Sequence, residues 1–281
     1  MRDSSKILDI SRINAAQKVN IKLFLMVSIL LALFNLSMVQ SKEVFSHADW
    51  EQVLSEYVDE HGLVDYVRLS RNPGIFNKYI SLIEDVGPRT NPDWFPTNHD
   101  RLAYYINAYN ALTLKGVLSR GPEDDSVWSG PISGYIFFEV MDIRVEGQQT
   151  TLKSLEDDVI RAGFLDPRIH AAIVCASISC PRLSRKAYTG ELLDRQLDNS
   201  MAEFVSEKTN VDVNNETLYL SSIFDWYEED FVSYEIRNGD IQGSDGMKVI
   251  HYINRYRLSN SQIDTKLRVR YFDYDKRINK Q

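Results

Sequence analysis

Both cysteines of the chain, Cys175 and Cys180, and one of its five histidines, His170, lie in the segment 166–183. Thiol and imidazole are the side chains that proteins most readily tune to react near neutral pH. A cysteine thiolate with a histidine partner can act as the nucleophile of acyl or amide transfer. We therefore take Cys175 and His170 as candidate catalytic residues.

The spacing of His170 and Cys175 does not by itself bring the two side chains together. On a straight helix they would be about 140° apart around the axis, and on a strand they would point to opposite faces. A local pair therefore requires the segment to bend. Without a bend, the histidine partner would be one of the other four histidines, His47, His61, His99 or His251.

A structural disulfide is the alternative interpretation of Cys175 and Cys180. Cysteines five residues apart lie too far apart in a straight helix or strand, because a bridge needs Cα atoms within about 7 Å. The residues between them, 176–179, would have to form a turn. Cys175 is the better candidate for reactivity, since Cys180 precedes Pro181 in a context typical of turns, and Ser177 and Ser179 would be available to line a pocket beside Cys175.

Residues 1–41 resemble a secretory signal peptide. A basic region precedes an apolar stretch of 14 residues, Leu23–Leu36, which is short of the roughly 20 that a membrane-spanning helix needs. Small residues predict cleavage after Ser41, and an uncleaved anchor is the alternative. We expect an exported protein, periplasmic or extracellular, with no membrane span after cleavage.

Charge limits the partners of the mature chain. Residues 42–281 carry 27 Lys and Arg against 38 Asp and Glu, a net charge near −11. Binding to nucleic acid requires a basic surface, so we expect no nucleic-acid partner. The partner is then an unknown substrate or a component of the cell envelope. These 240 residues suffice for one domain, 42–281, and contain no internal repeat or dividing linker.

Apolar periodicity and capping residues predict the helices that position the candidate site. They fall at 46–61, 73–87, 98–119, 151–162, 192–207 and 247–256, with a short acidic helix at 225–231. The helix at 98–119 is the longest and carries Asn107 and Asn110, three residues apart. Asparagine has poor helix propensity, so we predict that both amides are buried and hydrogen-bonded toward 166–183, and we include them in the candidate site. The alternative is that they only satisfy nearby backbone.

Strands are predicted at 135–138 and 143–145, before a turn at Glu146-Gly147. A hairpin at 211–220 turns at Asn214-Asn215, and a last strand covers 267–274. Asp166 and Pro167 are typical of a helix start, so 166–175 begins as a short helix, with a buried strand over 169–175 as the alternative. The fold class is α+β, a single helix-rich domain with a small antiparallel sheet or hairpins, and a papain-like arrangement is one candidate.

Several motifs, taken in order, resemble the family named domain of unknown function 547. They run from His47 to Asn279 and cover roughly Ser46 to Asn279: His47 with Trp50, Val64-Asp65-Tyr66, Ile106–Asn110, Asp166–His170, Cys175 through Cys180-Pro181, Trp226-Tyr227 with Asp230-Phe231, Tyr274-Asp275 and Asn279. The resemblance implies an exported bacterial member, and it implies little about the reaction. Lys276 stands where the family has tryptophan, which weakens any role for the last strand. Members that lack the second cysteine imply that a disulfide is not the general reason for Cys175.

Other site patterns are missing from the sequence. No Gly-rich phosphate loop, Gly-x-Ser-x-Gly motif or His-Glu-x-x-His motif occurs, and no zinc framework can be assembled near the cysteines. We expect no cofactor and no metal. The cluster at 225–231, rich in aromatic and acidic residues, either lines a binding cleft or docks its rings into the core. Two functions remain: a cysteine-dependent hydrolase or transferase, and a non-enzymatic envelope-binding module with a structural Cys175–Cys180 bridge.

Overall fold

The computed structural model describes residues 44–121, 124–130, 132–239 and 248–281. The predicted signal peptide, 1–41, and Met247, the predicted start of the last helix, lie outside these residues. Of the described residues, 53% are helical and the strands form two small sheets, so the fold is α+β and rich in helix, as predicted. A search of the described helices for one long and apolar enough to span a bilayer found none.

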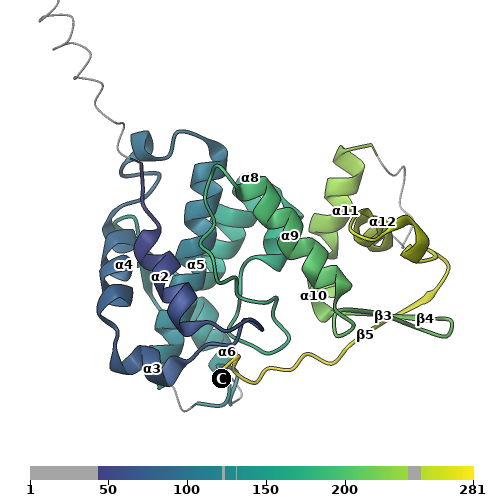
Figure 1. Cartoon of the computed structure of the whole chain (residues 1–281), viewed down its shortest axis with the longest axis horizontal. Coiled ribbons are helices and arrows are strands. Elements are labelled where there is room, and N and C mark those ends of the chain that lie inside the picture. The colour runs from purple at the N-terminus through teal and green to yellow at the C-terminus, as the bar shows by residue number, and fades with distance from the viewer. Residues whose placement is uncertain (1–43, 122–123, 131, 240–247) are drawn as a thin grey trace, which may run out of the picture. The chain divides into compact units, whose positions relative to one another are not determined.

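Helices cover most of the described chain (Figure 1). The α-helices are α2 (Ala48–Tyr57), α3 (Tyr66–Arg71), α4 (Gly74–Asp85), α5 (Asn98–Arg120), α6 (Ser133–Tyr135), α7 (Leu152–Ser154), α8 (Ala162–Phe164), α9 (Leu193–Ser206), α10 (Ser222–Trp226), α11 (Glu228–Arg237) and α12 (Lys248–Arg255). The 3₁₀ helices are η1 (Pro92–Trp94), η4 (Pro167–Ala171) and η5 (Ser259–Ser261). Two π-helical segments, η2 (Ile136–Val140) and η3 (Leu155–Arg161), continue α6 and α7.

The first sheet is a short antiparallel hairpin of β1 (Ile143–Val145) and β2 (Gln148–Thr150), in which Val145 pairs with Gln148 across the predicted turn. The second sheet has three strands, β3 (Val211–Asn214), β4 (Thr217–Leu220) and β5 (Arg268–Tyr271). Its β3–β4 hairpin is antiparallel, and Asn215 takes the left-handed conformation (φ 54°) that the turn requires. The last strand pairs parallel with β4, so this sheet is mixed rather than purely antiparallel.

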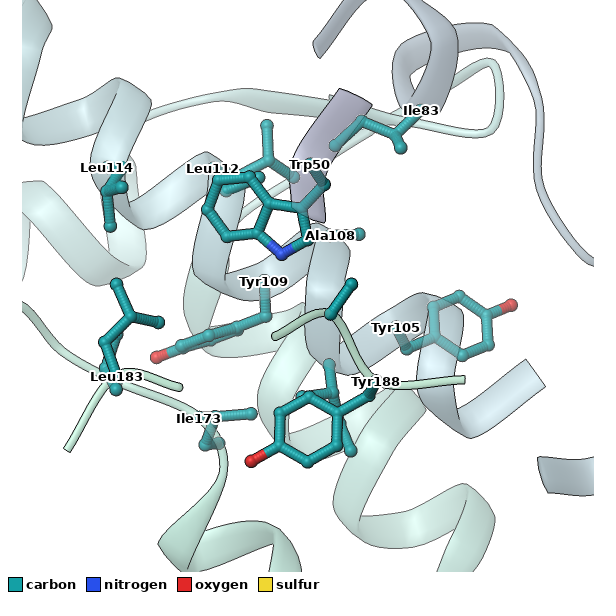
Figure 2. Packing of buried hydrophobic residues seen from close by; sticks show 14 of the residues in the cluster. Trp50, Ile83, Tyr105, Ala108, Tyr109, Leu112, Leu114, Ile173, Leu183 and Tyr188 are labelled. Carbon is teal, nitrogen blue, oxygen red and sulfur yellow. The ribbon is translucent and has the colours of Figure 1, made fainter. Parts of the chain in front are cut away.

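Helix α5 lies at the centre of the larger core (Figure 2). Thr97 and Asp100 form a reciprocal capping box at its start, and Gly121, with a φ of 123°, follows its end. Tyr104 and Ile106 lie on opposite sides of α5, and both are buried, because neighbouring elements surround the helix. Burial of each large side chain here stabilises the fold by about 1.5–3 kcal/mol. This helix therefore holds fixed the elements packed around it.

The strand predicted at Tyr135–Phe138 is wrong, because these residues are helical and belong to α6 and η2. Phe137 and Phe138 are consecutive and buried while Tyr135 and Ile136 are exposed, a pattern that fits helical turns and not strand alternation. Gly134 allows the close approach of this turn to Trp128, since a Cβ at Gly134 would lie 1.9 Å from an indole carbon. This turn forms part of the wall of the cavity described below.

A second core cluster joins α9, α10, α11, α12 and the three-stranded sheet. From that sheet the C-terminal segment returns to the N-terminal helices, and Figure 1 shows the chain end near α3 and α6. Ile178 donates its N–H to the Arg277 carbonyl, and Val64 donates its N–H to the Asn279 carbonyl. The C-terminal segment thus fastens the turn between the two cysteines to the first helices.

Candidate functional site

The segment 166–183 begins as a short helix, as the capping residues predict, and the alternative strand is not formed. The Asp166 carboxylate accepts from the Arg168 N–H at 3.0 Å, and Pro167 is the first residue of η4. After Ala171 the chain leaves the helix, and Ala176 adopts a left-handed conformation with a φ of 60°. Cys180 then donates its N–H to the Ser177 carbonyl, closing a turn. The bend that brings distant parts of the segment together is therefore present.

The two asparagines of α5 hold backbone in place. Asn110 is buried, donates to the Ala172 carbonyl and accepts from the Val174 N–H, both at 2.9 Å. Asn107 is buried as well, but it pairs in the same two-way manner with the backbone of Tyr188, outside 166–183. The expected contact with the segment is made by Asn110 and not by Asn107. Neither side chain lines the cavity described next, so both act as positioning residues.

A cavity of about 320 Å³ lies beside this segment. Its walls come from η3, η4, the turn that carries the cysteines, α10 and the C-terminal segment, and they are mostly apolar. The residues that carry polar or charged groups into this wall are Tyr109, Glu139, Lys153, Glu156, His170, Tyr227 and Tyr274 together with the two cysteines. His170 and Cys175 thus share one cavity. Ser177 and Ser179 do not line it, because Ser177 is buried and Ser179 accepts the Asp275 N–H.

The sulfurs of Cys175 and Cys180 lie at disulfide-bonding distance, with Cα atoms 6.2 Å apart. The Tyr274 hydroxyl hydrogen-bonds to both, at 3.1 Å from Cys175 Sγ and 3.2 Å from Cys180 Sγ. Burial raises the pKa of Tyr274 well above its ordinary value, so the phenol remains a hydrogen-bond donor at neutral pH. Lys276 weakens any role predicted for the last strand, yet Tyr274, just beyond β5, contacts both sulfurs.

His170 is paired with a carboxylate that the sequence did not identify. Its Nε2 lies 2.7 Å from Asp230 Oδ2, while Arg161 donates to both oxygens of Asp230, at 2.8 and 3.2 Å. Burial alone would raise the pKa of Asp230, but the hydrogen bonds from His170 and Arg161 outweigh it and hold that pKa well below its usual range. The imidazole also stacks on the Tyr227 ring, with centroids 4.0 Å apart. These contacts fix its orientation.

In the described chain no hydrogen bond joins His170 to either sulfur, and His170 Nδ1 has no partner there. The other four histidines do not line the cavity. His47 bonds to the Tyr79 hydroxyl at 2.8 Å, and burial lowers its pKa to about 3 despite the nearby Asp100. His99 lies 3.6 Å from Asp194, and His61 and His251 are exposed. His170 is therefore the histidine that the structure places nearest to cysteine chemistry.

Glu156, on η3, is a second carboxylate of the cavity that sequence reasoning missed. It is 6% exposed and accepts from the Tyr227 hydroxyl at 2.6 Å and from the Tyr109 hydroxyl at 2.9 Å. Its sequence signal was an acidic residue on the inward face of the helix predicted at 151–162. The cluster at 225–231 serves both interpretations, since Trp226 and Tyr227 line the cavity and Phe231 is buried in the second core.

The described residues include no group of three or more His, Cys, Asp and Glu side chains arranged to hold a metal ion. A cysteine pair that supplies a thiol when reduced, an imidazole with a carboxylate partner, and a second, separate carboxylate are together suited to nucleophilic chemistry or to recognition of a charged ligand.

Residues 95–205 match the sequence model of the family described as "Protein of unknown function, DUF547". This part of the chain belongs to that family, which confirms the resemblance drawn from the motifs. The matched region contains α5, Glu156, His170 and both cysteines, while Asp230 and Tyr274 lie beyond it. A search of curated proteins and a search of solved structures returned no match. The papain-like arrangement thus stays a prediction.

Proposed function

We propose that the protein is an exported cysteine-dependent hydrolase or transferase acting on an acyl or amide bond. The observation that carries the proposal is that Cys175, and a histidine paired with a carboxylate, His170–Asp230, line the same cavity. In this proposal Cys175 is the nucleophile and His170 the general base and acid. Asp230 orients the imidazole through Nε2, which leaves Nδ1 for proton transfer.

The reaction starts from the reduced protein. The Cys175 thiol loses its proton to His170 through a water in the cavity, since the two side chains make no direct hydrogen bond in the described structure. The thiolate attacks the acyl carbon, a bond from Sγ to that carbon forms, and the bond to the leaving amine or alcohol breaks. The imidazolium returns its proton to the leaving group. Water or an acceptor then attacks the thioester and releases Cys175.

Thiol labelling of the reduced full chain tests this proposal. Iodoacetamide should alkylate Cys175 in Cys180→Ser with an apparent pKa below the 8.5 or so of a free thiol. Adding His170→Ala to this variant should shift that pKa upward, and His99→Ala, at an exposed histidine, serves as the control. Incubation with p-nitrophenyl acetate should leave an acetyl group on Cys175, detected by mass spectrometry. Labelling that begins only above about pH 8.5 and ignores His170 would remove the catalytic role.

A second candidate function is a non-enzymatic binding module of the cell envelope. The observation that favours it is the disulfide-bonding distance between Cys175 and Cys180, because disulfides persist in proteins exported to oxidising compartments. Alkylation followed by mass measurement, on protein from such a compartment without added reductant, separates the two candidates. A free thiol at Cys175 supports the enzyme, and complete protection of both cysteines supports the binding module.

Export is part of both candidates. The predicted cleavage after Ser41 means that N-terminal sequencing of the mature protein should begin at Lys42, in a periplasmic or extracellular fraction. Intact Met1 in a membrane fraction would identify the segment as an anchor instead. The acidic balance of residues 42–281 supports a substrate or an envelope component as partner rather than nucleic acid.

A further inference from the structure

The thiol chemistry leaves one cavity carboxylate without a role. Glu156 is buried, and its two oxygens accept only from the Tyr227 and Tyr109 hydroxyls. No ion pair to Glu156 occurs among the described residues. Removing a carboxylate from water without a cation partner costs several kcal/mol. The other two buried glutamates avoid this cost, since Glu146 pairs with Arg89 and Glu235 with Arg255.

Neighbouring cations of the described chain make other contacts: Lys153 and Arg161 pair with other carboxylates, and Lys276 lies over the Trp128 ring, with Nζ 4.9 Å from the ring centroid. Lys153 lines the cavity, but its Nζ lies 2.6 Å from Asp157 Oδ2. Arg161 binds Asp157 and Asp230. The remaining acidic side chain of the wall, Glu139, is exposed and adds negative charge at the edge.

Aromatic rings line the same cavity as this carboxylate. Seven Phe, Tyr and Trp rings line it, from Tyr109, Trp128, Tyr135, Phe138, Trp226, Tyr227 and Tyr274. The face of an aromatic ring attracts an organic cation, by about 0.5–1 kcal/mol at exposed sites and more where water is excluded. A volume of about 320 Å³ suits a small molecule. A cavity that contains both aromatic rings and a buried carboxylate favours binding of a cationic group over a neutral or anionic group of the same shape.

From these contacts we infer that the cavity binds an alkylammonium group, with Glu156 as its counter-charge and the surrounding rings as its cage. As a statement about substrate, this rests on the proposed function: the acyl or amide compound that Cys175 attacks carries an ammonium group. The binding itself does not require catalysis, so it can be measured separately.

Three probes of the same shape and different charge test the inference on the full chain. They are choline, its neutral isostere 3,3-dimethyl-1-butanol, and the anion 3,3-dimethylbutanoate, followed by tryptophan fluorescence and calorimetry. We expect choline to bind at least tenfold more tightly than the alcohol, and the anion to show no saturable binding. Glu156→Gln should abolish the preference. Asp158→Asn, which removes an exposed charge two residues away, should retain it.

Equal affinity for choline and the alcohol in the wild type would overturn the inference, and so would a preference that survives Glu156→Gln. If Glu156→Gln does not fold, Trp226→Leu replaces it: this ring is 54% exposed and lines the cavity, and its loss should weaken choline more than the alcohol. If Trp226→Leu left the ratio of choline affinity to alcohol affinity unchanged, the aromatic rings would not contribute to binding the cation.

The same titration with Cys175→Ser separates this inference from the proposed function. Choline preference should persist there, since the serine cannot affect the charge of Glu156. If thiol labelling gives an ordinary Cys175 while choline selectivity remains, catalysis fails and the cation site stands. If Cys175 is activated while all three probes bind alike, the cation site fails and the enzyme stands.

Discussion

Two buried glutamates occupy matching positions against one helix and have different surroundings. Glu146 accepts from the Tyr105 hydroxyl at 2.9 Å, and Glu156 accepts from the Tyr109 hydroxyl at 2.9 Å, one turn further along α5. Glu146 also receives the Arg89 guanidinium at 2.6 Å and the Arg89 N–H at 2.7 Å. Glu156 instead has a second tyrosine and no cation in the described chain.

Their surroundings explain what each cluster does. The Glu146 cluster is closed: a Cβ at Gly87 would lie 2.7 Å from Glu146 Cβ, so nothing further fits there. The Glu156 cluster borders the cavity. A carboxylate with a built-in arginine stabilises the fold, whereas one without a cation is free to hold a ligand's charge. The two clusters thus share a glutamate that accepts from a tyrosine of α5, and they differ in the arginine and in access to the cavity.

The tyrosines keep the same state in both clusters. Burial and the adjacent carboxylate raise the pKa of Tyr105 and of Tyr109 well above the ordinary value. Both phenols therefore stay protonated and donate to their glutamates throughout the physiological range. The difference between the clusters consequently lies in the cation and not in the tyrosines.

The largest expected effect is a loss of stability when either buried asparagine of α5 is replaced. Asn110→Ala and Asn107→Ala each leave two backbone groups without their side-chain partners, at about 1–3 kcal/mol per group. We expect urea denaturation to show a loss of about 4 kcal/mol in unfolding free energy for each. Only Asn110→Ala should also change the alkylation rate of Cys175, because Asn110 holds the backbone of Ala172 and Val174.

If both alanine variants retained wild-type stability, the hydrogen bonds from α5 would not anchor these backbones. Asn107→Ala could instead change the alkylation rate of Cys175 as much as Asn110→Ala does. The contact of Asn107 with Tyr188 would then matter to the cysteine as much as the contacts of Asn110 do. Either result would break the comparison.

Loss of charge should lower the stability of the fold more in the Glu146 cluster than in the Glu156 cluster. Glu146→Gln removes half of an ion pair whose carboxylate is fully buried and whose arginine is 48% exposed. Breaking a fully buried pair costs about 3–5 kcal/mol, and the exposure of Arg89 reduces that to about 2 kcal/mol. The measurement is again urea denaturation. Asp85→Asn, in an exposed pair with Arg144, is the control and should change stability by less than about 0.5 kcal/mol.

Local signals in the sequence predict the helices well and the site only in part. The capping box and apolar face of 98–120 are encoded within the helix, so its bounds were predictable. The strand predicted at 135–138 is wrong because aromatic and β-branched residues are typical of strands, and here tertiary packing overrides that preference. Asp230 and Tyr274 reach His170 and the sulfurs from 60 and 99 residues away. Such contacts depend on tertiary packing, and the spacing of residues in the sequence does not predict them.

Acid should weaken the fold through Asp230, which pairs with His170 and Arg161. Hydrogen bonds from His170 and Arg161 outweigh burial and lower its pKa below the ordinary value of about 3.9, so its contribution is present above about pH 4 and is lost as the pH falls below that. Asp230→Asn should therefore show a shallower fall in stability between pH 4 and pH 2 than the wild type. Denaturation at several pH values measures this, with Asp158→Asn as a control expected to follow the wild type.

The smallest expected effect is the one that sharpens the comparison most. Glu156→Gln removes a buried charge that has no cation, which removes the cost of keeping that charge away from water. It also leaves one acceptor oxygen in place of the two that accept from the tyrosine hydroxyls. These two changes oppose each other, so we expect the unfolding free energy to change by less than about 1 kcal/mol, against about 2 kcal/mol lost in Glu146→Gln. Parallel urea denaturation of the two variants measures the difference. Equal losses would mean that Glu156 stabilises the fold as Glu146 does, and that its missing cation has no bearing on ligand binding.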